Sequence, residues 1–70
     1  MQYSEHAVGR LADRSLTKAE VEGVIANPSR GIYEPRGRDR REHFGYAADG
    51  RRLNVVTNKA VSVVISVIEQ

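Results

Sequence analysis

The first 14 residues carry apolar side chains at the spacing of a helix that buries one face. Ser4 precedes them, and serine is a preferred helix N-cap residue because its side-chain oxygen accepts a hydrogen bond from a backbone N–H of the first turn. The pattern therefore predicts a short helix over residues 5–13. Its buried stripe is formed by Ala7, Val8, Leu11 and Ala12.

The next stretch predicts a second helix from its capping residues. In Thr17-Lys18-Ala19-Glu20, the threonine hydroxyl and the glutamate carboxylate can each accept the other's backbone N–H, which is a capping box. Leu16 and Val21 occupy the positions of a hydrophobic staple around it. Pro28 ends the helix, because proline disfavours the α conformation in the residue before it.

The second half of the chain is β-branched and alternates in polarity, which predicts strands. We expect strands over 40–47, 52–57 and 61–68, with a hairpin turn at Asp49-Gly50 and a short strand or extended crossing at 32–34. Within 40–47, Glu42, Phe44 and Tyr46 point to one face of the sheet. The predicted fold is α+β, with two N-terminal helices packed on one face of a three- to four-stranded antiparallel sheet.

The last predicted strand has two unequal faces. One is wholly apolar and is expected to lie under the helices: Val61, Val63, Ile65 and Val67. The other, with Ser62, Val64, Ser66 and Ile68, is small and half apolar, whereas a solvated face is normally more polar. We therefore expect a central strand, and a partner interface that includes Val64 and Ile68.

Seventy residues accommodate one domain, 1–70, whose single core supplies about 3–5 kcal/mol of net stability. The sequence has no cysteine, which excludes disulfides and thiolate metal sites, and two histidines are too few for a zinc site without carboxylates. We expect no metal and no cofactor. The sequence has neither an apolar stretch of membrane-spanning length nor a signal-peptide pattern at its start, so we expect a cytoplasmic protein without membrane contact.

Positive charge is concentrated in the middle of the chain. Residues 30–52 contain seven arginines and four acidic residues, a net charge of +3, whereas the whole chain carries +2. Such a segment attracts polyanions, so six arginines are candidate phosphate-binding residues: Arg36, Arg38, Arg40, Arg41, Arg51 and Arg52. A charged loop or edge strand that prevents aggregation explains the same pattern.

His6, Arg10 and Arg14 lie four residues apart and form one stripe on a helix that continues to Arg14. Histidine can transfer protons near neutral pH, and arginine can hold a phosphate and its developing charge, which are the requirements of an RNA-cleaving site. A polar outer helix face is the alternative. His43, flanked by arginines, is a further candidate general acid or base, or an ordinary residue of the sheet surface.

Over most of its length, the chain resembles a family of small bacterial domains of unknown function. The more specific parts of the shared pattern are His6-Ala7-x-x-Arg10, which continues as x-x-x-Arg14, and Asp49-Gly50-Arg51. That family is similar to the RelE and BrnT toxins of toxin–antitoxin modules. The resemblance implies a RelE-like fold and a candidate ribonuclease or translation inhibitor, normally held by an antitoxin. It also implies site roles for His6, Arg10, Arg14 and Arg51.

The leading functional interpretation is a toxin-like protein directed at RNA or the ribosome, a candidate metal-independent endoribonuclease or translation inhibitor. His6 or His43 would transfer protons, and arginines would bind phosphate. The alternative is a non-catalytic interaction module whose sheet face binds a protein partner or a second copy in a homodimer.

Overall fold

A computed structural model describes residues 1–29, 33 and 39–70. Along the chain it contains β1 (Gln2–Tyr3), α1 (Glu5–Arg14), α2 (Lys18–Ala26), β2 (Arg40–Tyr46), β3 (Arg52–Asn58) and β4 (Val63–Glu69). The α+β class, the two helices and the three long strands are as predicted. Strand β1 was not predicted.

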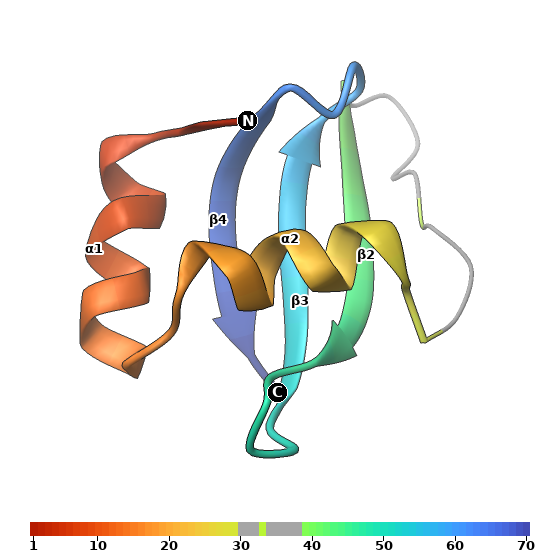
Figure 1. Ribbon diagram of the computed structural model, residues 1–70. Helices are drawn as coiled ribbons and strands as arrows, with labels where there is room; N and C mark the ends of the chain where they lie inside the picture. Colours follow the sequence, from red (N-terminus) through yellow and green to blue (C-terminus); the bar gives the residue numbers. More distant parts are fainter. Residues whose placement is uncertain (30–32, 34–38) are drawn as a thin grey trace.

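The four strands form one mixed sheet in the order β1-β4-β3-β2, of which Figure 1 shows β4, β3 and β2 side by side. β2, β3 and β4 pair antiparallel, as predicted, whereas β1 pairs parallel with β4. The prediction of a wholly antiparallel sheet is therefore wrong at this edge, where two residues are too few to show a strand pattern. β4 lies between β1 and β3, which confirms that it is an interior strand. Of the stretch 32–34, Tyr33 forms a single antiparallel bridge with Glu42, and its neighbours lie outside the described residues.

Both helices begin at the predicted caps. The Ser4 hydroxyl accepts the Ala7 N–H at 3.0 Å, and α1 then continues to Arg14. In α2 the reciprocal capping box between Thr17 and Glu20 is present. The second Glu20 oxygen accepts the Ala48 N–H at 2.8 Å, so the capping carboxylate also ties the start of α2 to the β2–β3 turn.

The two helices occupy different positions on the sheet. α2 crosses one face of it, and α1 lies alongside β4 (Figure 1). Ala7 and Leu11 are buried, but Val8 and Ala12 are exposed, so the apolar stripe of α1 is narrower than predicted. α1 therefore borders the sheet, and its polar side remains beside the face that α2 leaves uncovered.

A β-bulge in β4 changes which residues face the core. Val56 pairs with Ser66 and Thr57 pairs with Val64, so Ile65 is an extra residue on β4. Such a residue loses its place in the hydrogen-bond ladder, and the Ser4 hydroxyl donates to the Ile65 carbonyl at 2.8 Å.

The bulge corrects the predicted faces of the last strand. Val64 and Val67 are 0% and 1% exposed and both belong to the core, although they are three residues apart. Val61 lies before β4, with φ at 55°. The prediction that Val64 shares an exposed interface with Ile68 is wrong. Ile68 itself is 48% exposed.

Candidate functional site

The His6, Arg10 and Arg14 stripe lies beside the sheet face that α2 leaves uncovered. The three side chains line a cavity of ≈340 Å³ together with Ser66, Val67 and Ile68 of β4. Arg10 is half exposed and lies 3.7 Å from the Asp13 carboxylate, a weak surface ion pair. The predicted stripe is thus one wall of a concave surface, with β4 as its floor.

A second cavity, of ≈370 Å³, extends this surface across the sheet. His6 lines it from α1, and Arg40 and Glu42 line it from β2. Its floor is formed by Val56, Ile65, Ser66 and Ile68. Because His6, Ser66 and Ile68 line both cavities, we treat the two as one site, the open-face trough.

Glu42 is a trough residue that sequence reasoning did not select. Its Oε1 accepts a hydrogen bond from Asn54 Nδ2 at 2.9 Å, and Asn54 is only 5% exposed. A buried amide thus orients the carboxylate. The alternation of β2 correctly places Glu42 on the face opposite His43, but the sequence does not indicate that α1 brings His6 to that face.

His43 lies in the protein interior, where it is 1% exposed. Its Nε2 and the Thr57 Oγ1 are hydrogen bonded at 2.9 Å, and its Nδ1 makes no hydrogen bond to the described residues. Burial, and secondarily the nearby Arg41 guanidinium, lower the pKa of His43 below its usual value. The interpretation of His43 as a sheet-surface residue is wrong, and the imidazole of the trough belongs to His6.

The predicted phosphate-binding arginines are divided among several places. Arg40 lines the trough, and Arg52 lines a separate cavity beside Phe44. Arg41 alternates with Arg40 along β2 and is half-buried on the side of His43. Arg36 and Arg38 lie outside the described residues.

Arg51 holds the hairpin, α1 and β4 together. Its Nε donates to Asp49 at 2.8 Å, and its Nη1 donates to the Arg14 carbonyl at 2.6 Å and to Glu69 at 3.3 Å. The hydrogen bond with Asp49 raises the pKa of Arg51, and the same contact lowers the pKa of Asp49. These contacts give the Asp49-Gly50-Arg51 run a structural role, whatever else Arg51 binds.

Within residues 1–29, 33 and 39–70, no three His, Asp or Glu side chains form a group that could hold a metal ion. In the same part of the chain, no helix is long and apolar enough to cross a membrane.

Comparison with known proteins places the chain in a family. Residues 3–69 match the model of a domain of unknown function, DUF4258. Searches of curated proteins and of solved structures found no match. The match spans both helices and all three long strands, together with every trough residue named above. The chain therefore belongs to the DUF4258 family.

Proposed function

We propose that this protein binds and cleaves RNA in the open-face trough, as a toxin-like member of a bacterial toxin–antitoxin type system. The observation that carries the proposal is the lining of the trough. An imidazole, a carboxylate and three guanidinium groups, from His6, Glu42, Arg10, Arg14 and Arg40, border one concave surface. The resemblance to a family similar to RelE- and BrnT-type toxins implies the same assignment and a RelE-like packing, which remain part of this proposal.

The arginines would bind the phosphodiester. A guanidinium presents several N–H donors in a planar fork that matches phosphate oxygens, and it stabilises the charge that builds on them during displacement. Arg10 and Arg14 approach from α1 and Arg40 from β2, so a strand lying in the trough would meet positive charge on both sides. For a single strand, each phosphate contact contributes about −0.7 to the slope of log K against log salt.

Glu42 and His6 would transfer the protons. The Glu42 oxygen that Asn54 does not hold takes the proton from the ribose 2′-hydroxyl, and the 2′-oxygen attacks the phosphorus. The bond from phosphorus to the 5′-oxygen breaks, and protonated His6 donates its proton to that oxygen. The products are a 2′,3′-cyclic phosphate and a 5′-hydroxyl end, and the reaction requires no metal.

Two variants test the reaction. His6→Asn and Glu42→Gln preserve side-chain size and polarity but remove the proton-transfer groups. We expect each to lower RNA cleavage by about 10²-fold or more while RNA binding stays within about twofold. Mass spectrometry of the cut ends checks for the cyclic phosphate. Equal cleavage by Glu42→Gln and the unmodified protein would refute the pair.

A charge variant tests the binding surface. Arg10→Ala should weaken RNA binding and reduce the salt slope by about 0.7. Lys59→Ala is the matched control, because it removes one positive charge from an exposed turn outside the trough. Equal losses in the two variants would show that general charge, and not the trough, attracts the RNA. If the protein degrades free RNA no faster than background, ribonuclease activity on free RNA is contradicted. If cells that express it also grow normally, translation inhibition is contradicted as well.

A second candidate function is protein binding by the same face. Ile68 is 48% exposed in the trough floor, where an antitoxin or a second copy of the chain could cover it. A homodimer formed there should dissociate on Ile68→Asp, which sedimentation measures. If the unmodified protein is monomeric at high concentration, the homodimer is excluded, and an antitoxin that competes with RNA remains the partner to seek.

A further inference from the structure

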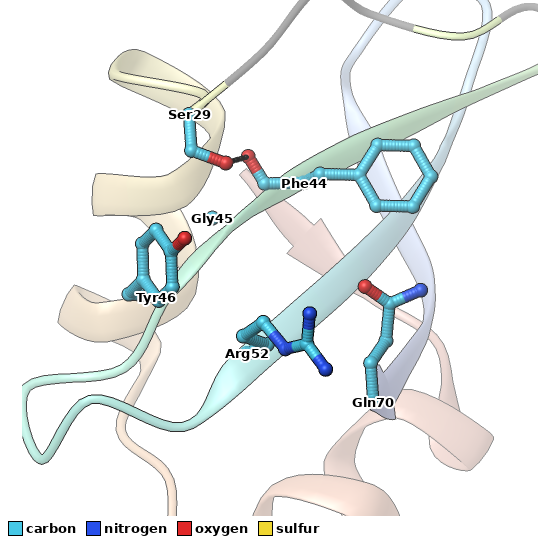
Figure 2. A pocket seen from close by; sticks show the side chains of 6 residues that line it. All are labelled: Ser29, Phe44, Gly45, Tyr46, Arg52 and Gln70. Carbon is cyan, nitrogen blue, oxygen red and sulfur yellow. Dashed lines mark hydrogen bonds between the residues drawn. The ribbon is translucent and has the colours of Figure 1, made fainter.

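A third cavity lies at the β2–β3 hairpin end of the sheet. Its volume is ≈210 Å³, below the roughly 300 Å³ at which pockets for drug-sized ligands begin. It is lined by Ser29, Phe44, Gly45, Tyr46, Arg52 and Gln70. Figure 2 shows the Arg52 guanidinium with the Tyr46 ring on one side of it and the Gln70 amide and the Phe44 ring on the other. The size suits one planar fragment with polar edges.

Main-chain hydrogen bonds fix the walls of this cavity. Ser29 donates to the Phe44 carbonyl from both its N–H, at 2.7 Å, and its hydroxyl, at 3.1 Å. The Gln70 N–H donates to the Arg52 carbonyl at 2.8 Å, and Tyr46 is the direct cross-strand partner of Arg52. Tyr46 and Arg52 are therefore carried on paired strands, which hold them in place better than a loop would, and Ser29 and Gln70 are hydrogen bonded to those strands.

The chemistry of the lining fits a nucleobase. Tyr46 is 57% exposed, and aromatic rings bind bases by stacking. Arg52 is the charged group of the cavity, and it has donors and no acceptor. Guanine presents two adjacent acceptors, O6 and N7, to such a fork, whereas adenine presents an amino donor at the corresponding position.

We propose that this cavity is a guanine-binding subsite. Its role, which rests on the proposed function, is to set the nucleotide preference of the RNA site. Tyr46, on which the base would stack, lies four residues from Glu42 on the same face of β2, a separation of about 13 Å. An RNA strand whose base stacks in the cavity thus extends along β2 and brings a neighbouring phosphodiester to the trough. Arg52 then reads a base, whereas the trough arginines hold the backbone.

The first experiment needs no RNA. Guanosine 5′-monophosphate is titrated into the ¹⁵N-labelled protein, and the amide shifts of residues 44–46, 52 and 70 are followed. We expect these shifts to move, with binding about tenfold weaker for adenosine 5′-monophosphate and for 7-deazaguanosine 5′-monophosphate, which lacks the N7 acceptor. Equal binding of the guanine and adenine nucleotides would overturn the subsite.

Two matched variants locate the effect. Arg52→Lys keeps the charge but loses the fork, and should weaken guanosine monophosphate binding by about tenfold. Arg40→Lys makes the same change in the trough and should leave base preference unaltered. If Arg52→Lys binds as well as the unmodified protein, Arg52 is a cross-strand partner of Tyr46 and nothing more.

RNA substrates separate the two proposals. Oligonucleotides of adenosine with a single guanosine should be cut next to that guanosine, and Arg52→Lys should abolish the preference. Cleavage without base preference would refute the subsite and leave the proposed function standing. Guanosine monophosphate binding without RNA cleavage or RNA binding would refute the proposed function and retain a guanine site.

Discussion

Adding one methyl group at Gly45 tests how closely α2 approaches the sheet. A Cβ at this position would lie 2.9 Å from Val24 Cγ1, 3.1 Å from Cγ2 and 3.3 Å from Cβ. Comfortable carbon contacts are about 3.5–4.0 Å, so the three atoms would have to retreat together by roughly half an ångström. Val24 is 2% exposed and β-branched, which leaves it little rotamer freedom. We expect Gly45→Ala to cost about 1–3 kcal/mol.

Urea unfolding followed by circular dichroism measures this cost, and the same substitution in a helix provides the control. At Gly23 of α2 an added Cβ meets no atom within 4 Å, so Gly23→Ala should stabilise the protein by up to about 1 kcal/mol through helix propensity. In a Val24→Ala background, which removes the clashing methyl groups, Gly45→Ala should cost much less. The steric reasoning is refuted if Gly45→Ala is neutral, or if its cost is the same in both backgrounds.

Three further predictions concern the cap and the pH dependence of folding. Ser4→Ala should destabilise by about 1–3 kcal/mol in the same assay, because it removes the α1 cap and the donor to the Ile65 carbonyl; Ser4→Thr should restore part of the loss. The free energy of unfolding should fall as the pH drops below 6.5, the usual pKa of histidine, because His43 binds a proton in the unfolded chain more readily than in the folded core. His43→Gln should make the free energy of unfolding less dependent on pH in that range. The hydrogen bonds from the Ala48 and Thr17 N–H groups lower the pKa of Glu20. They therefore stabilise the folded protein fully above pH 4.5, and this stabilisation is lost as the pH falls through the folded-state pKa. The stability of Glu20→Gln should accordingly depend less on pH below 4.5.

Local chemistry in the sequence was enough to locate the helices and the long strands. Ser4 and the Thr17–Glu20 capping box mark helix starts because their hydrogen bonds involve residues at most three positions away. Pro28 and Asp49-Gly50 restrict the backbone at and next to their own positions, so the helix end and the turn could also be predicted from the sequence. The spacing of His6 and Arg10 could be interpreted for the same reason, because it concerns neighbours on one helix.

The tertiary structure decided which of these residues meet. Alternation along a strand predicts two faces, but the extra residue Ile65 reverses the pattern within β4 and moves Val64 into the core. The burial of His43 beneath the helices was likewise decided by tertiary structure. It depends on how β2 pairs with β3, and not on the residues next to His43 in the sequence.

The candidate site shows the same division. The sequence determined the stripe of His6, Arg10 and Arg14, because helical spacing alone aligns it. Only the packing of α1 along β4 brings that stripe to the trough, opposite Arg40 and Glu42, residues that lie more than 25 positions away in the chain. Contacts over such separations depend on how whole elements pack together, and periodicity along one element carries no information about them.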